Sequence, residues 1–187
     1  MIRVLVVDDH PALRTGLVAL LRGEPGMVPV AAAADVHAAA AESARHEPDV
    51  VLADYHLRGG DGLSLCLDLK SAPDPPRVLI YTAFAGDGLS LAAAVAGADG
   101  VVDKGARADE LFDALRTVAG GRVTLPRRSP DLLGTLSALL APDDLPVLGM
   151  RLEGTPVPDI AEVLDVTEAQ VGDRLRGILA KLGAPRR

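Results

Sequence analysis

The stretch VVLAD, residues 50–54, decides how we expect the chain to fold. Four apolar residues lead directly into the carboxylate of Asp54, and the chain then turns polar and glycine-rich through residues 55–62. A short apolar run bounded by turn residues is typical of a strand buried on both faces of a parallel sheet. Chemistry in such sheets gathers beyond the carboxyl ends of the strands, where Asp54 falls. Because many strand-end aspartates only open a turn, Asp54 has to be judged by its neighbours.

Apolar stretches alternate with amphipathic ones from residue 2 to residue 119, which predicts five strand–helix units in series. This order predicts a doubly wound α/β domain with a five-stranded parallel sheet, right-handed crossovers and helices on both faces. The predicted strands are residues 2–7, 28–33, 50–54, 77–82 and 100–103. The predicted helices are residues 11–22, 35–45, 62–70, 87–96 and 107–119.

Polar side chains follow several of these strands at the point where each strand ends. They are Asp8 and Asp9, Asp54, Thr82 and Lys104. If the first and third strands are neighbours, all of these side chains converge on one crevice. Three carboxylates so close together repel one another and need a cation, and a few oxygen ligands with room for water suit Mg2+. With a hydroxyl and an ammonium at the rim, the set predicts a site for a phosphoryl group on a carboxylate.

Residues 1–121 resemble a response-regulator receiver domain. The resemblance rests on the segments VDDHP (7–11), VLADYHLRGGDGL (51–63), YTAFA (81–85) and GADGVVDKGA (97–106). It implies the strand order 2-1-3-4-5, with Asp54 as the phosphoacceptor and Thr82 and Lys104 holding the phosphoryl oxygens. The metal ligands that it implies are Asp9, Asp54, the backbone carbonyl of His56, and Asp8 through water.

Two positions depart from the receiver pattern. Receivers of this type usually have Met-Pro-Gly after the phosphoacceptor strand, where this chain has Leu57-Arg58-Gly59. Arg58 could pair with Asp61 or reach a partner, and the simplest expectation is an unpaired loop arginine. The position three before the lysine is commonly an aromatic residue that turns inward when the threonine engages phosphate, and here it is Val101. We therefore expect intact phosphorylation chemistry with a smaller movement on phosphorylation.

The C-terminal part, residues 142–187, predicts a small all-α helix-turn-helix domain. Its helices are expected over residues 143–152, 158–164 and 167–182, and Thr167 is a good N-cap for the last of them. Asp165 is tolerable where a left-handed turn residue is needed. Between the two domains, residues 122–141 predict a linker with a short helix in its middle.

This C-terminal part resembles the LuxR-type output domain of NarL/FixJ response regulators, through LAPDDLPVL (140–148), DIAEVL (159–164) and residues 167–183. In that family the last of the three helices enters the DNA major groove. The implied DNA contacts are Thr167, Gln170, Arg174, Arg176 and Lys181. The usual lysines and histidine are replaced by Ala169, Gly172 and Arg174, and relatives commonly continue into a further helix that supports dimerisation. We expect a shortened output domain with weak or dimer-dependent DNA binding.

Composition limits the partners and the compartment. Hydrophobic residues make up 49% of the chain, which supports a packed core. The formal net charge is −7, and acids outnumber bases after residue 141, unlike a typical nucleic-acid-binding domain. The single cysteine, Cys66, excludes an internal disulfide, and no apolar run is long enough for a signal peptide or a membrane span. These features predict a cytoplasmic protein without a membrane partner.

Three functions compete for this pattern. The leading hypothesis is a transcription regulator rather than an enzyme, phosphorylated by a sensor histidine kinase and binding promoter DNA as a homodimer joined through the receiver. The alternative is a receiver whose helix-turn-helix binds another protein. A haloacid-dehalogenase-like phosphatase also uses an aspartate after a strand, but it needs a second aspartate two residues further on, where this chain has His56.

Overall fold

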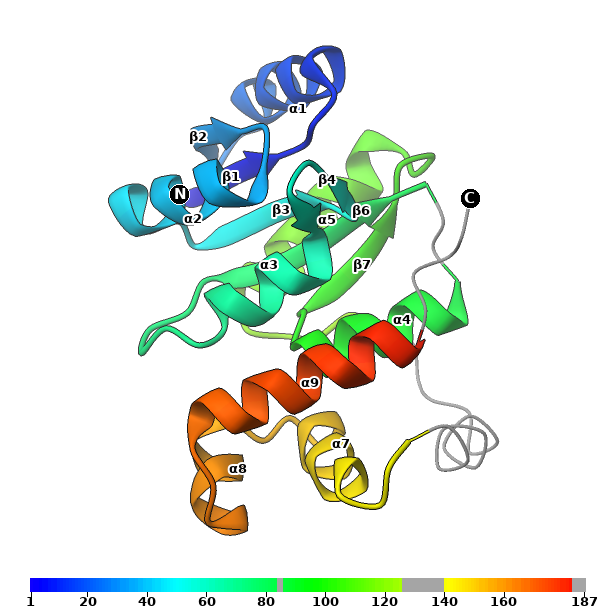
Figure 1. Ribbon diagram of the computed structural model, residues 1–187. Helices are drawn as coiled ribbons and strands as arrows, with labels where there is room; N and C mark the ends of the chain where they lie inside the picture. Colours follow the sequence, from blue (N-terminus) through cyan, green and yellow to red (C-terminus); the bar gives the residue numbers. More distant parts are fainter. Residues whose placement is uncertain (84–85, 126–139, 183–187) are drawn as a thin grey trace.

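The computed structural model describes residues 1–83, 86–125 and 140–182, which form an α/β domain followed by three helices (Figure 1). The strands are β1 (Ile2–Val7), β2 (Met27–Ala33), β3 (Val50–Asp54), β4 (His56–Leu57), β5 (Gly60–Asp61), β6 (Arg77–Thr82) and β7 (Gly100–Asp103). The helices are α1 (Pro11–Gly23), α2 (Val36–His46), α3 (Gly62–Leu69), α4 (Asp87–Ala96), α5 (Ala108–Ala119), α7 (Asp144–Leu152), α8 (Val157–Leu164) and α9 (Glu168–Leu182).

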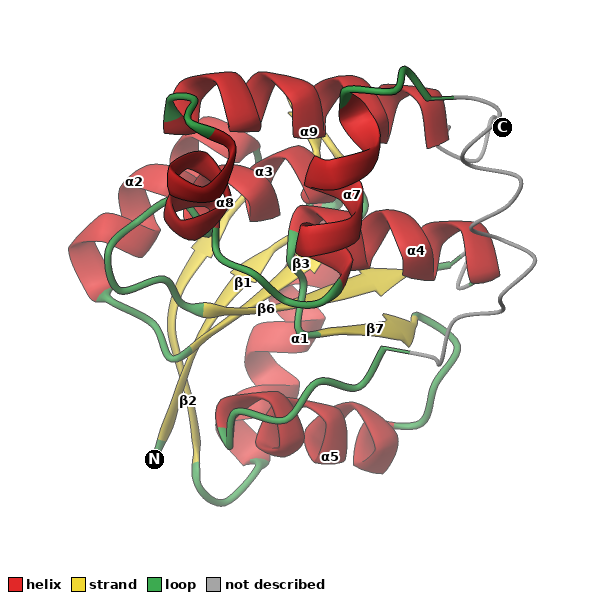
Figure 2. Ribbon diagram, turned by 90° about the horizontal axis from the view of Figure 1, so that it is seen from below, coloured by secondary structure: helices red, strands yellow, loops and turns green. Residues whose placement is uncertain are grey.

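The main sheet is parallel and has the order β2-β1-β3-β6-β7, which confirms the predicted 2-1-3-4-5 arrangement. Successive residues of β1 point to opposite faces, as the pleat requires. Val4 and Val6 pack with α1 and α5, whereas Leu5 and Val7 pack with α2, α3 and α4. Figure 2 shows these two helical layers on opposite sides of the sheet. The order places the carboxyl ends of β1 and β3 side by side.

A short hairpin, β4–β5, with two residues in each strand, follows β3 and was absent from the predicted elements. The chain turns at Gly59, whose φ of 80° lies in the left-handed region. The chain then closes back on β3, because the Gly62 N–H donates to the carbonyl of Tyr55 at 2.8 Å. A Cβ on Gly62 would overlap the carbonyl oxygen of Asp54, so only glycine fits there. Asp61 then caps α3 by accepting from the N–H of Ser64.

The three C-terminal helices confirm the predicted helix-turn-helix architecture. Asp165 joins α8 to α9 with a φ of 53°, in the left-handed conformation that was predicted. Thr167 caps α9 by accepting from the N–H of Gln170 at 3.2 Å. Val171, Leu175 and Ile178 of α9 are fully buried against α7 and α8. The short helix predicted within the linker lies outside the described residues.

The three C-terminal helices pack directly on the α/β domain. In Figure 1, α9 lies along α4, and α7 also contacts α4. Leu91 and Val95 of α4 share one apolar cluster with Leu148 and Ile178. Arg151 of α7 is only 8% exposed. Its guanidinium donates to the carbonyls of the two last residues of α4, from Nε to Val95 and from Nη2 to Ala96, each at 3.1 Å.

Candidate functional site

The strand-end residues predicted from the sequence meet at one edge of the sheet. Asp8 follows β1, Asp54 ends β3, Thr82 ends β6 and Lys104 follows β7. Asp8, Asp54 and Thr82 are almost completely buried, with exposures of 0%, 4% and 1%. We call the pocket formed by Asp8, Asp9, Asp54 and Lys104 the acid pocket.

Lys104 bridges two of the carboxylates in the acid pocket. Its Nζ lies 2.7 Å from Oδ2 of Asp54 and 2.9 Å from Oδ2 of Asp8. The backbone also fixes the lysine, because its N–H donates to the carbonyl of Thr82 at 2.7 Å. The Tyr81 ring lies below the ammonium, with 5.7 Å between Nζ and the ring centroid. The Lys104 ammonium can therefore exchange a carboxylate contact for a contact with an anion bound beside that carboxylate.

Burial sets the protonation behaviour of this pair. Desolvation raises the pKa of Asp54 above 3.8, against the opposing effect of the Lys104 ammonium, and the nearby Asp8 adds to the rise. For Lys104, burial alone would lower the pKa, but the hydrogen bonds and charges of Asp54 and Asp8 outweigh it, so the pKa is raised. The ammonium is therefore held charged in the pocket.

The donor set of the acid pocket fits a hard divalent cation. Ligand atoms of Asp8, Asp9, His10 and Asp54 all lie within 4.8 Å of one another. Oδ1 of Asp9 is buried, lies 2.7 Å from Nδ1 of His10, and accepts no hydrogen bond from the described residues. Clustered carboxylate oxygens with one such unsatisfied acceptor are the ligands that Mg2+ prefers. That the His56 carbonyl binds the metal stays a prediction. The backbone N–H of His56 donates to Oδ1 of Asp54 at 3.4 Å.

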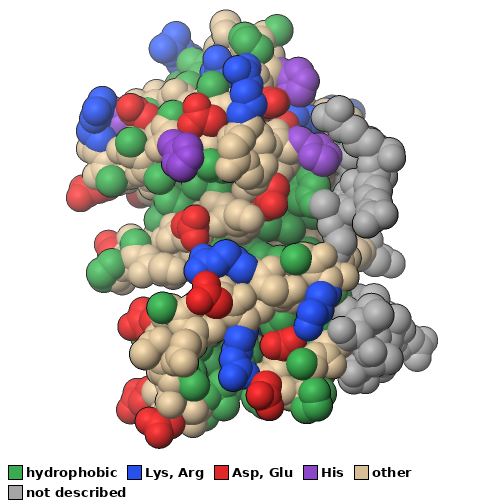
Figure 3. All heavy atoms as spheres, viewed as in Figure 1, with side chains coloured by type: hydrophobic (Ala, Val, Ile, Leu, Met, Phe, Trp, Pro, Cys, Tyr) green, Lys and Arg blue, Asp and Glu red, His purple; other side chains and the backbone are tan. Residues whose placement is uncertain are grey.

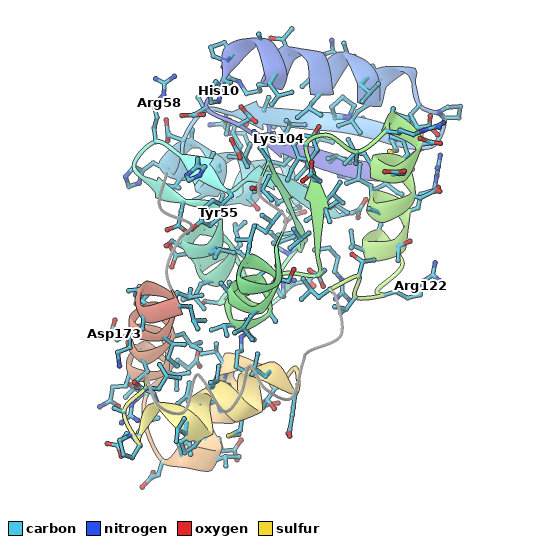
Figure 4. The ribbon with its side chains drawn as sticks, turned by 90° about the vertical axis from the view of Figure 1, so that its right-hand side faces the viewer. His10, Tyr55, Arg58, Lys104, Arg122 and Asp173 are labelled. Carbon is cyan, nitrogen blue, oxygen red and sulfur yellow. The ribbon has the colours of Figure 1, made fainter. Side chains whose placement is uncertain are left out.

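Two residues at this pocket were missed or misjudged from the sequence. His10 adjoins two aspartates, and this adjacency was the available signal. Arg58 is not the unpaired loop arginine that we expected, because its Nη2 donates to the backbone carbonyl of Asp9 at 3.1 Å. The β4–β5 hairpin carries the arginine across to the loop between β1 and α1, a contact between residues 49 apart in sequence. Figure 4 shows Arg58 and His10 close together above the pocket that holds Lys104.

The predicted DNA contacts lie on α9 and at its N-terminus, and each cation among them has a partner within the chain. Nη1 of Arg174 donates to the carbonyl of Asp143 at 2.6 Å, and Lys181 pairs with Asp144 at 2.9 Å. Arg176 lies 2.9 Å from Asp173 and 3.4 Å from Asp68, which belongs to α3 of the α/β domain. Thr167 and Gln170 bond to each other at the start of the helix. In Figure 3, basic and acidic side chains are interspersed over the coloured part of these helices.

The sheet order and the acid pocket together define a receiver domain. The family model described as "Response regulator receiver domain" matches residues 4–116. The DNA-binding transcriptional activator DevR/DosR of Mycobacterium tuberculosis is 35% identical over 198 residues, covering 100% of this chain and 91% of that protein. The nitrate/nitrite response regulator protein NarP of Escherichia coli is 31% identical over 189 residues, covering 96% of this chain and 88% of that protein.

A solved structure supports the same assignment. The two-component response regulator of the LuxR family from Aurantimonas sp. SI85-9A1 matches with a TM-score of 0.63 and 33% identity, covering 74% of this chain and 96% of that one. The chain belongs to the NarL/LuxR family of two-component response regulators, whose receiver domain is a phosphoacceptor and not a catalytic enzyme. Among the described helices, none has the length and apolar character needed to cross a membrane.

Proposed function

We propose that Asp54 accepts a phosphoryl group from a sensor histidine kinase, and that the receiver thereby controls a DNA-binding output domain. The observation that carries this proposal is the Lys104 bridge between Asp54 and Asp8, buried at the carboxyl end of the sheet. A nucleophilic carboxylate needs cations around it to admit an anionic reactant. The acid pocket supplies one ammonium and a donor set suited to Mg2+.

In the proposed reaction, a carboxylate oxygen of Asp54 attacks the phosphorus of the donor. The new O–P bond forms as the P–N bond to the donor imidazole breaks, and the leaving nitrogen keeps the electron pair. Lys104 exchanges its contact with Asp54 for a phosphoryl oxygen, and the Thr82 hydroxyl holds a second one. Asp9, Asp54 and the His56 carbonyl would hold Mg2+, with Asp8 through water, and the ion would supply neutralising charge there.

Intact-mass measurement tests the phosphoacceptor directly. Wild-type protein with acetyl phosphate and Mg2+ should gain one phosphoryl group, and Asp54→Asn should gain none. Asp103→Asn is the matched control, because Asp103 ends another strand of the main sheet, β7, at the same edge of the sheet. Equal labelling of wild type and Asp54→Asn would refute the assignment, and omission of Mg2+ should suppress labelling of both wild type and control.

The proposed target of the output domain is promoter DNA, with Thr167, Gln170, Arg174, Arg176 and Lys181 as contacts. The relative DevR/DosR is named a DNA-binding transcriptional activator, which favours this function over the alternative of a protein-binding output domain. Counterion release should be small, because these positions offer few cations. We therefore infer that specific binding needs two subunits, joined through the receiver, so that effective concentration adds to weak contacts.

The observed packing bears on how that dimer could form. Because α7 and α9 cover α4, a receiver dimer in this arrangement has to use another surface, and α1 and α5 lie on the other side of the sheet (Figure 2).

The cytoplasm is the location consistent with a promoter target and a kinase donor. Size-exclusion chromatography with and without acetyl phosphate tests the dimer, and a strictly monomeric phosphorylated protein that binds DNA tightly would refute it.

A further inference from the structure

We propose that Arg58 is a phosphodonor-binding residue, whose guanidinium attracts the anionic donor to Asp54 and at the same time lowers the affinity of the acid pocket for Mg2+. The inference rests on the proposed phosphorylation of Asp54. It begins from the place of Arg58 at the tip of the β4–β5 hairpin, where receivers of this type usually carry proline.

The backbone of Arg58 is held in place from one side. A bridge links Arg58 to Asp35, and the N–H of Val36 at the start of α2 donates to the Arg58 carbonyl at 3.5 Å. The left-handed turn at Gly59 follows immediately. The hairpin is therefore anchored to α2 just where the arginine side chain leaves it.

The side chain of Arg58 links two loops at the rim of the acid pocket, near His10 (Figure 4). It starts from the loop after β3, which carries Asp54, and its Nη2 reaches the Asp9 carbonyl in the loop after β1, at 3.1 Å. Arg58 is exposed, and this bond uses one of the five N–H donors of a guanidinium. The remaining donors have no partner among the described residues and can meet an anion that enters from solvent, and a guanidinium matches phosphate oxygens in pairs.

The charge of the pocket explains why a cation at the rim is needed. Asp8, Asp9 and Asp54 are opposed by the ammonium of Lys104, and a bound Mg2+ brings the set only to neutrality. A phosphorylated donor is itself an anion and would approach such a pocket without net attraction. Arg58 supplies a permanent positive charge on its path.

The same charge has the opposite effect on the metal. A cation at the rim repels Mg2+ while it attracts the donor, because both effects follow the sign of the charge. A purely structural arginine, which only ties the two loops together, would support both ligands. Removal of the charge therefore separates the two roles. If Arg58 binds the donor, Mg2+ affinity should rise while the phosphorylation rate falls. If Arg58 is only structural, both should fall.

The test uses Arg58→Gln, which keeps an N–H donor for the Asp9 carbonyl and removes the charge. Calorimetric titration should show Mg2+ affinity rising on the order of fivefold in low salt, the size of one screened charge interaction at short range. At saturating Mg2+, the rate of phosphorylation by acetyl phosphate should fall by a similar factor and depend less on salt. Arg58→Lys should keep most of the wild-type rate.

Arg45→Gln is the control, because it removes another exposed cation, one of α2 that pairs with Glu42. It should leave both measurements unchanged. A parallel fall in Mg2+ affinity and rate in Arg58→Gln, or no change in either, would overturn the proposal, as would a loss in Arg58→Lys equal to that in Arg58→Gln. Labelling of Asp54→Asn would instead refute the assignment of Asp54 as the phosphoacceptor. The Mg2+ titration would still test the effect of the Arg58 charge on metal affinity.

Discussion

Asp8 and Asp54 are two acids that the fold buries side by side, and Lys104 is the cation that makes this arrangement tolerable. The first and third strands of the sheet bring the carboxylates together, and each is costly to bury in its charged form. The raised pKa of Asp54 records that cost. Burial of these carboxylates therefore lowers the stability of the folded protein and leaves Asp54 as a poorly solvated nucleophile, an arrangement that functional sites commonly have.

Asp54→Asn should make the protein more stable at neutral pH in Mg2+-free buffer. The folded-state pKa of Asp54 is raised above its unfolded value, so the ionised carboxylate destabilises the folded state. As pH falls through that raised pKa, wild-type Asp54 takes up a proton and the penalty disappears. Urea unfolding from neutral pH down to about pH 4 should show the advantage of the variant shrinking. An advantage that grows as pH falls would contradict this account.

The site residues differ in how far the sequence could predict them. Asp8, Asp9, Asp54, Thr82 and Lys104 each follow a strand that shows clear periodicity, so their convergence follows from the sheet order alone. The contact of Arg58 with Asp9 joins two loops far apart in sequence. No local pattern carries such a contact, because it depends on how a hairpin folds over the end of the sheet.

Among the elements, the long ones were predictable and the short ones were not. β1, β3, β6, α4 and β7 have the predicted bounds, and β2 and the other helices differ by one residue at one or both ends. The β4–β5 hairpin has two residues in each strand, too few for any alternation to show. Its signal was the glycine-rich run 59–62, which indicated only a loop.

The hairpin provides a test of how closely the phosphoacceptor strand is supported. Gly62→Ala should destabilise the protein by about 2 kcal/mol or more, because its Cβ overlaps the backbone of Asp54 and neither group is a movable side-chain end. Displacing that backbone should also slow phosphorylation. Gly16→Ala in α1 is the control: its Cβ meets nothing within 4 Å, and helix propensity favours the change by roughly 1 kcal/mol. Equal effects of the two substitutions on stability would show that the overlap is relieved at no cost.

In the whole molecule, the contact between the domains is a packed interface. The shared apolar cluster joins Leu91 and Val95 of α4 to Ile178 of α9, and Arg176 pairs with Asp68 of α3. The helix proposed to enter the major groove is thus engaged by the receiver and by acids of its own domain. The sequence predicted both domains but not their contact, because the helices that form the contact each have the ordinary pattern of an amphipathic helix.

Arg151 is the residue of this interface whose removal should separate the domains. Its guanidinium satisfies the Val95 and Ala96 carbonyls at the end of α4, and it fits because Gly97 has no Cβ: one placed there would overlap Nη2. Burial lowers its pKa, and the desolvation cost is offset by these bonds together with a third, from Nη1 to the carbonyl of Thr155 at 3.3 Å. Arg151→Met keeps the apolar bulk and removes the guanidinium donors from these carbonyls.

We therefore expect Arg151→Met to lower the free energy of unfolding by roughly 1–3 kcal/mol and to loosen the contact between α4 and α7. Freed from α4, α9 should bind a cognate promoter fragment without phosphorylation, at an affinity nearer that of the phosphorylated wild type. Electrophoretic shifts in both phosphorylation states measure this, and adding Arg174→Ala should abolish the gained binding, because Arg174 lies early in the recognition helix. Arg116→Met, which removes an arginine of α5 paired with Glu24 and Asp113, should leave DNA binding unchanged. A folded Arg151→Met protein that still requires phosphorylation to bind DNA would show that the interface does not restrain α9.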